Sequence, residues 1–211
     1  IRFTITKETE KSFYDIFTLA EELNVNKIYI SHLVYSGRGK ENLEIDISKE
    51  KRVEYVDFMI KKAFEYYENN KHIDIVTGNM EMDAVMLLKE FEKRYPFFVD
   101  SLKNRLKAWG GNSAGKRLGN MDWNGFVKPD PFFPLTIGNY LQKDFDKVWL
   151  DEENELLTKL RQFPRVLKGK CSSCKYIDIC NGGSRSRAYA ISGDLWEEDP
   201  SCYLSEDEIK G

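Results

Sequence analysis

The chain has 211 residues, of which 41% are hydrophobic, enough for one domain or two small ones to bury a core. The 32 basic and 35 acidic side chains nearly balance, so no overall electrostatic field favours nucleic acid as a partner. No apolar run approaches the roughly 18 residues of a membrane span, and we expect no membrane partner. The chain opens on Ile1 in what reads as a strand in progress, and we interpret it as a fragment.

The first 95 residues alternate between strand and helix patterns. Strands are predicted at residues 1–6, 27–33 and 73–76. Helices are predicted at residues 8–23, 48–69 and 80–95, where apolar residues recur at helical spacing, with Ser48 as the N-cap of the second helix. This alternation is typical of βαβ units around a parallel sheet.

The pattern changes after residue 95. A helix is predicted from Pro96 to residue 109, followed by a glycine-rich loop at 110–115. A β-hairpin is predicted at 116–128 with a type I′ turn at Asn124-Gly125, and two helices at 143–150 and 152–163. We therefore predict two parts, a βα part at residues 1–109 and a smaller α+β part at residues 110–211.

All four cysteines lie in the last fifth of the chain. They are Cys171, Cys174, Cys180 and Cys202, with the spacing C-x2-C-x5-C-x21-C. Disulfides would brace the whole fold, whereas the first 170 residues or so carry no cysteine. Clustered thiols are typical of metal ligands in a reducing compartment, so we expect a cytoplasmic protein with a metal site.

Four thiolates form a complete ligand set either for a zinc ion or for an iron–sulfur cluster. Zinc ribbons usually carry two C-x2-C pairs, and this chain has one. A cluster tolerates irregular spacing because each thiolate binds a different iron. Asn181-Gly182-Gly183 would free backbone N–H groups to face the cluster, and Arg185 and Arg187 would supply positive charge, although a solvated helix face is the alternative for these arginines. The residues favour a cluster and leave zinc open.

Several motifs carry a resemblance to a known family. In the cysteine region they are Cys-x2-Cys-Lys-Tyr-x3-Cys-Asn-Gly-Gly-x-Arg-x-Arg-Ala-Tyr, Ser-Gly-Asp at 192–194 and Asp-Pro-Ser-Cys at 199–202. This region resembles the SPASM/twitch extension of radical S-adenosylmethionine (radical SAM) enzymes. The stretches 31–40, 76–79 and 109–115 make the chain similar to the NirJ/AhbC branch, which modifies tetrapyrrole side chains in haem d1 and alternative haem biosynthesis.

The resemblance implies an α/β fold, in which the C-terminal βα units of a partial (β/α)6 radical SAM barrel precede a small α+β SPASM/twitch iron–sulfur domain. Asn112 and Asp130 stand where the wider twitch pattern has cysteines that ligate a first auxiliary cluster. One auxiliary 4Fe–4S cluster is then implied, on the four cysteines. The C-x3-C-x2-C loop for the catalytic 4Fe–4S cluster and S-adenosylmethionine does not occur in these 211 residues. We expect it upstream, and we expect this polypeptide alone to be inactive.

The resemblance also implies contacts at the carboxyl edge of the parallel sheet. Expected contacts to S-adenosylmethionine are Arg2, Thr4, Leu33 and Val34. Expected contacts to the tetrapyrrole are His32, Tyr35, Arg38, Asn79, Asn112 and Arg117. Arginine suits this role because a guanidinium binds a carboxylate with two parallel hydrogen bonds. A hydrogen-bonded core position is the alternative for His32, and no catalytic residue is assigned.

The hypothesis is the C-terminal half of a radical SAM oxidoreductase that modifies acetate or propionate side chains of a sirohaem-derived tetrapyrrole. The auxiliary cluster would accept or pass an electron, and a ferredoxin or flavodoxin would be the reductant. Two alternatives stay open. One is a SPASM enzyme that modifies a peptide, and the other is a non-catalytic zinc-binding interaction module.

Overall fold

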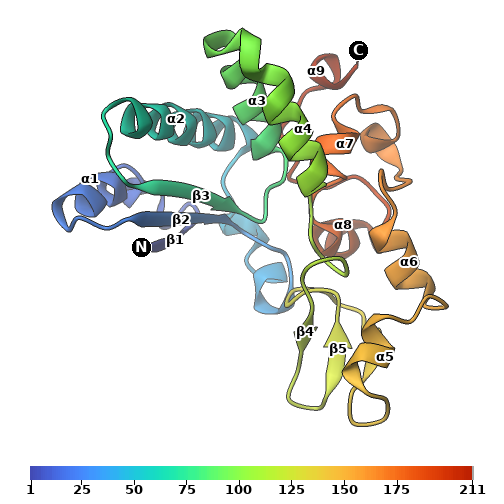
Figure 1. Cartoon of the computed structure of the whole chain (residues 1–211). Coiled ribbons are helices and arrows are strands. Elements are labelled where there is room, and N and C mark those ends of the chain that lie inside the picture. Colours follow the sequence, from blue (N-terminus) through green and yellow to red (C-terminus); the bar gives the residue numbers. More distant parts are fainter. Residues whose placement is uncertain (211) are drawn as a thin grey trace.

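A computed structural model describes residues 1–210 of the chain, and a three-stranded parallel sheet organises its first half (Figure 1). Its strands are β1 (Arg2–Ile5), β2 (Lys27–His32) and β3 (Asp74–Gly78), in the order β1-β2-β3. The helices that connect and follow them are α1 (Asp15–Glu22), α2 (Lys49–Glu68), α3 (Asp83–Arg94) and α4 (Val99–Trp109). Short 3-10 turns lie at Glu10–Ser12, Gly37–Lys40, Leu43–Ile45 and Pro96–Phe98. The predicted strand–helix alternation is confirmed.

Helix α2 begins where the sequence predicts. The Ser48 side chain accepts a hydrogen bond from the Lys51 amide at 3.2 Å, which satisfies one of the free N–H groups of the first turn. Helix α1 is shorter than predicted because its first turns form the separate 3-10 turn at Glu10–Ser12.

The two faces of the parallel sheet differ in chemistry. Ile28, Ile30 and His32 are buried on one face, where the two isoleucines pack with the core formed by α1, α2 and α3. Side chains alternate along a strand, so Tyr29 and Ser31 point to the other face, opposite Arg2 and Thr4 of β1. This second face is polar and partly exposed, with Thr4 Oγ1 2.8 Å from Ser31 Oγ. Helices therefore cover one face of the sheet.

The second half holds a small antiparallel sheet and short helices (Figure 1). Its strands are β4 (Asn120–Met121), β5 (Phe126–Lys128) and β6 (Gly138–Asn139), and the last of these was not predicted. The helices are α5 (Phe145–Trp149), α6 (Glu155–Arg161), α7 (Ile177–Cys180), α8 (Arg185–Ser192) and α9 (Glu206–Ile209), with a 3-10 turn at Gly169–Ser173. Helices α5 and α6 correspond to the two predicted after residue 142.

The predicted type I′ turn in the hairpin is wrong. A type I′ turn needs a positive φ at both central residues, and here Gly125 has φ 82° while Asn124 does not have a positive φ. The Asp122 carboxylate accepts hydrogen bonds from the amides of Asn124 and Phe126 at 3.0 and 3.1 Å. This side chain stabilises a longer turn over residues 122–125.

The cysteine region packs against the first half of the chain. Ile179, Cys180 and Cys202 belong to the same hydrophobic core as Ile5 and Ile30 of the parallel sheet. The contact places the cysteines next to the helices that cover the sheet. The division at residue 109 stays a prediction.

Among residues 1–210, the structure has no helix that is long and apolar enough to cross a membrane.

Candidate functional site

The four cysteines line one cavity. Cys171 lies in the 3-10 turn, Cys174 directly follows it, Cys180 ends α7, and Cys202 lies in the loop before α9. Cys180 and Cys202 are buried, the other two are half-buried, and all four are free thiols. The remaining wall is largely apolar and includes Met82. Residues 31 positions apart in sequence therefore face one space.

The four cysteines supply four possible thiolate ligands for a metal centre. In residues 1–210, no three His, Cys, Asp or Glu side chains are grouped in a way that would hold one metal ion. The four cysteines nevertheless surround a common cavity. In a 4Fe–4S cluster each thiolate binds a separate iron, so the four sulfurs stand further apart than they do around zinc. Four thiols around one cavity therefore supply the complete ligand set of such a cluster, as they would that of a zinc ion.

Positive side chains stand close to the thiols. Burial raises the pKa of all four thiols, to about 11 for Cys171 and well above its ordinary value for Cys180. The positive charge of Arg185 lowers the pKa of Cys171 and that of Lys170 lowers the pKa of Cys202, both against the effect of burial. Lys170 also donates a hydrogen bond to the Cys202 carbonyl at 3.2 Å. These cations favour thiolates, the form that binds metal.

The turn after Cys180 depends on its two glycines. Asn181, Gly182 and Gly183 have φ values of 51°, 86° and 65°, all in the left-handed region. A Cβ atom on Gly182 would lie 2.1 Å from the Leu167 Cδ1 atom, so there is also no room for a side chain at this position. The expected hydrogen bonds from this turn to a cluster stay a prediction.

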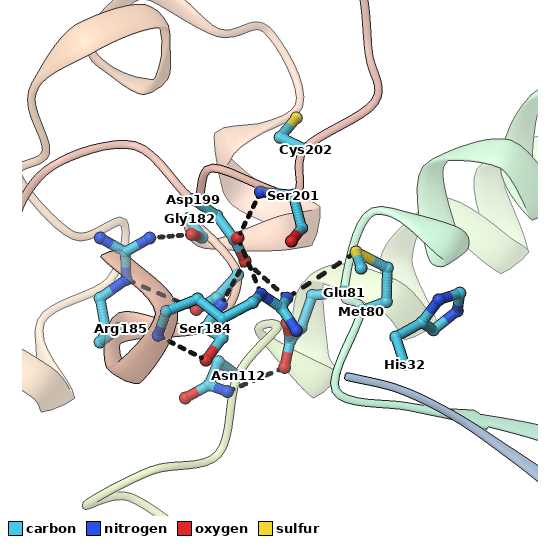
Figure 2. A network of polar contacts seen from close by, with 12 residues as sticks. His32, Met80, Glu81, Asn112, Gly182, Ser184, Arg185, Asp199, Ser201 and Cys202 are labelled. Carbon is cyan, nitrogen blue, oxygen red and sulfur yellow. Dashed lines mark hydrogen bonds and ion pairs between the residues drawn. The ribbon is translucent and has the colours of Figure 1, made fainter. Parts of the chain in front are cut away.

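Both arginines of α8 are buried, so the solvated-face alternative is wrong. Arg185 and Arg187 are 1% and 0% exposed. Arg187 donates through Nε and Nη2 to the two carboxylate oxygens of Asp199 at 2.9 and 2.7 Å, and Figure 2 shows the network around this carboxylate. Burial opposes ionisation of Asp199, but Arg187 holds its pKa below the ordinary value. Arg185 instead donates to main-chain carbonyls, including that of Leu195 at 2.8 Å.

A second cavity, of about 320 Å³, lies at the carboxyl end of β3. This volume is within the range of ligand pockets. The cavity brings together two predicted substrate residues, Asn79 and Asn112, and Asp130 lines it as well. Ile179 forms part of the wall and directly precedes Cys180, so the two cavities are neighbours. Its other lining residues include Tyr29, Thr77, Glu81, Trp109, Ser113 and Phe132.

Two buried carboxyl groups, those of Glu81 and Asp130, line this cavity. Glu81 Oε1 accepts a hydrogen bond from Asn112 Nδ2 at 2.8 Å, while Glu81 Oε2 is buried without a partner in the described chain (Figure 2). Burial raises the pKa of Glu81, and it raises that of Asp130 to about 6. Neither carboxyl forms an ion pair within residues 1–210. The cavity therefore favours protonated carboxyl groups.

Sequence reasoning missed Glu81. The residue lies in the turn between β3 and α3, where no periodic pattern marks a site. The nearest signal is the strand end at Gly78-Asn79, which predicts Asn79 as a site residue and gives no sign of Glu81.

The residues expected to contact S-adenosylmethionine divide into two groups. Arg2 and Thr4 lie on the uncovered sheet face, with the Arg2 guanidinium 4.8 Å from the centre of the Tyr29 ring. Leu33 and Val34 follow β2 at the carboxyl edge, and Val34 is buried. Their contacts to the cofactor stay predictions.

The other expected substrate residues do not meet in the cavity. His32 is 2% exposed and hydrogen-bonds Asp83, and Tyr35 is 8% exposed. Arg38 is exposed in its 3-10 turn. Arg117 is exposed, donates to the Trp109 carbonyl and to Ser113, and stacks on the Trp109 ring.

The chain matches no family model, but curated proteins align with nearly its whole length. Pre-heme d1 synthase of Dinoroseobacter shibae is 38% identical over 208 residues, which cover 97% of this chain and 51% of the relative. Fe-coproporphyrin III synthase of Methanosarcina barkeri is 32% identical over 213 residues, covering 99% and 53%. AdoMet-dependent heme synthase of the same organism is 28% identical over 211 residues, covering 96% and 55%.

The chain belongs to the NirJ/AhbC family of radical SAM enzymes. It spans about half the length of the curated relatives it matches. A solved structure described as native anSMEcpe with bound AdoMet has the same fold, with a TM-score of 0.62 and 15% identity. The match covers 96% of this chain and 51% of that one.

Proposed function

We propose that this chain is the part of a radical SAM oxidoreductase that carries one auxiliary 4Fe–4S cluster. The whole enzyme would modify acetate or propionate side chains of a sirohaem-derived tetrapyrrole in haem or haem d1 biosynthesis. The observation that carries this proposal is the single cavity lined by all four cysteines, in a chain whose relatives are named for haem compounds. We also propose a cytoplasmic location and a ferredoxin or flavodoxin as reductant.

Cys171, Cys174, Cys180 and Cys202 would hold the cluster, which would supply one-electron transfer. Each residue of this set would fill one iron site, which leaves no open position. The buried charge of Arg185 would offset negative charge on the cluster, and so would the charge of Lys170.

The uncovered face of the parallel sheet would be the inner face of a partial (β/α)6 barrel. Parallel sheets are normally covered on both faces, and within residues 1–210 no helix lies over the face that carries Arg2, Thr4, Tyr29 and Ser31. We propose that this face and the segment of Leu33 and Val34 border the S-adenosylmethionine site. A second 4Fe–4S cluster would belong to the C-x3-C-x2-C loop of the whole enzyme.

The cavity at the end of β3 would hold part of the tetrapyrrole. Asn79 has no side-chain hydrogen bond within residues 1–210 and is free to bind a ligand. Trp109 is 61% exposed and offers an aromatic surface to a flat macrocycle. Arg38 would bind a carboxylate from the solvent side, and Arg117 could do so only by leaving its present hydrogen bonds.

The proposal is tested by metal analysis of anaerobically purified chain. Wild-type protein is expected to be brown and to hold about four irons with matching sulfide. Cys171→Ala and Cys202→Ala should each lose the iron. Ser172→Ala is the matched control, because Ser172 lies between two of the ligands and is exposed. A colourless protein with stoichiometric zinc would support the interaction module instead.

The substrate is tested by titration with Fe-coproporphyrin III while the fluorescence of the chain's four tryptophans is followed. Saturable quenching is expected, and it should weaken in the double variant Asn79→Ala, Glu81→Gln. Trp123→Phe is the control because this residue lies in the hairpin turn and is 92% exposed. Binding of unstructured peptides in place of the porphyrin would favour the peptide-modifying alternative.

A further inference from the structure

The end of β2 is bonded to the loop that carries the fourth cysteine. We call residues 32–35 the β2 end and residues 199–203 the Cys202 loop. The two segments are more than 160 residues apart in sequence, yet three separate polar contacts join them. Figure 2 shows Ser201 directed towards the network and Cys202 directed away from it.

The first contact runs through a buried carboxylate. His32 Nε2 lies 3.1 Å from Asp83 Oδ2, and the Tyr203 hydroxyl donates to Asp83 Oδ1 at 2.8 Å. All three side chains are buried, with exposed fractions of 2%, 6% and 7%. Asp83 therefore links the last residue of β2 to the residue that follows Cys202.

The second contact runs through Arg187. Its Nη1 atom donates to the Leu33 carbonyl at 3.2 Å, while the rest of the guanidinium holds the Asp199 carboxylate. Asp199 also accepts a hydrogen bond from the Ser201 amide at 3.0 Å, which fixes the turn before Cys202.

The third contact is direct. The Tyr35 hydroxyl lies 2.9 Å from Ser201 Oγ and donates to Asp46 Oδ2 at 2.5 Å. Arg52 completes the contact, since it pairs with Asp46 at 2.7 Å and donates to the Ser201 carbonyl at 3.2 Å.

Two of the three contacts are buried, and the Arg187–Leu33 bond is partly buried. Water competes little for buried groups, and a buried polar atom that loses its partner is destabilised. Displacement of the Cys202 loop would break several of these bonds together. The β2 end and the Cys202 loop therefore form one hydrogen-bonded unit.

We propose that the β2 end holds Cys202 in the position from which it binds the cluster, so that His32 and Tyr35 are positioning residues for the cluster and do not contact the substrate. This inference rests on the proposed function, since it takes the cysteines as cluster ligands. Leu33 and Val34 lie in the same unit. A ligand bound at the β2 end would then affect the surroundings of Cys202, and the reverse coupling would be equal.

The test uses the purified chain with its cluster and two variants that each remove one hydroxyl, Tyr35→Phe and Tyr203→Phe. Tyr66→Phe is the matched control. Tyr66 is 1% exposed and its hydroxyl donates to Glu21 at 3.0 Å, in the region of α1 and α2. The measurements are amide hydrogen exchange of residues 199–203 and the electron paramagnetic resonance spectrum of the reduced cluster.

Tyr35→Phe and Tyr203→Phe are expected to speed exchange in the Cys202 loop by about tenfold and to shift or broaden the spectrum, with the iron content unchanged. Tyr66→Phe should match wild type in both. Unchanged exchange and an unchanged spectrum in both variants would overturn the inference. If Tyr35→Phe fails to fold, Ser201→Ala removes the same contact from the other side. A wild-type chain without iron would refute the proposed function, while exchange in the loop would still test the three contacts.

Discussion

Replacement of Asp130 by asparagine is expected to stabilise the fold at neutral pH. Asp130 is 8% exposed and lines the cavity at the end of β3. Burial, together with the nearby Glu81 carboxyl, raises its pKa from 3.8 to about 6, although hydrogen bonds from the amides of Phe132 and Phe133 act in the opposite direction. Ionisation of this group therefore opposes folding.

The size of the effect follows from the two pKa values. The folded state binds the Asp130 proton more tightly than the unfolded state, so the free energy of unfolding falls as pH rises from 3.8 to about 6. One pKa unit corresponds to about 1.4 kcal/mol, so the difference amounts to about 3 kcal/mol above pH 6. The side-chain amide of the Asp130→Asn variant would carry no charge, and its oxygen could still accept the Phe132 amide. The stabilisation should approach this value at pH 7 and disappear near pH 4.

The assay is urea-induced unfolding of the reduced, metal-free chain between pH 4 and pH 7, followed by circular dichroism. Asp122→Asn is the matched control. Asp122 accepts the amide two residues ahead in the same way as Asp130, but it is only partly buried. Parallel stability curves for wild type and Asp130→Asn across this range, or a less stable variant at pH 7, would refute the argument.

Three further changes have defined outcomes. Gly111→Ala places a Cβ atom 2.2 Å from the Cys180 carbonyl oxygen, at a φ of 66°. It should lower the free energy of unfolding in urea by on the order of 2 kcal/mol or more. Gly37→Ala is the control and should lower it by less, because Gly37 has a similar φ of 55° and open space around its Cβ position. Asp199→Asn leaves buried Arg187 without its charged partner and should lower the free energy of unfolding by about 3–5 kcal/mol, and a loss below about 1 kcal/mol would contradict a buried ion pair. With a reductant and S-adenosylmethionine, the chain alone should form no 5′-deoxyadenosine by chromatography, because it has no C-x3-C-x2-C loop; release above the protein-free blank would contradict this.

Local patterns predicted most of the elements of the first half. The three parallel strands and the start of α2 at Ser48 follow from side-chain periodicity and from a cap, both of which involve neighbouring residues. The predicted turn type of the hairpin was wrong because the Asp122 side chain accepts hydrogen bonds from the amides that decide the turn type. Strand β6 was missed since two residues carry no periodic signal.

The candidate site was only partly accessible from sequence. Asn79 and Asn112 were expected near a ligand and do line one cavity, whereas Glu81 gave no signal. Arg38 lies outside this cavity, and no local sequence pattern indicates where an exposed arginine will be directed.

By itself, the sequence predicted the candidate ligand set and the order of the elements. Four cysteines in one short region predict a metal site. Thiolates are metal ligands, and local folding of a short segment can bring them together. Only the tertiary structure decided that His32 and Tyr35 turn inward towards the Cys202 loop, and that Asp130 shares a cavity with Glu81. Contacts between residues so far apart depend on how helices and sheet pack together, which no local pattern encodes.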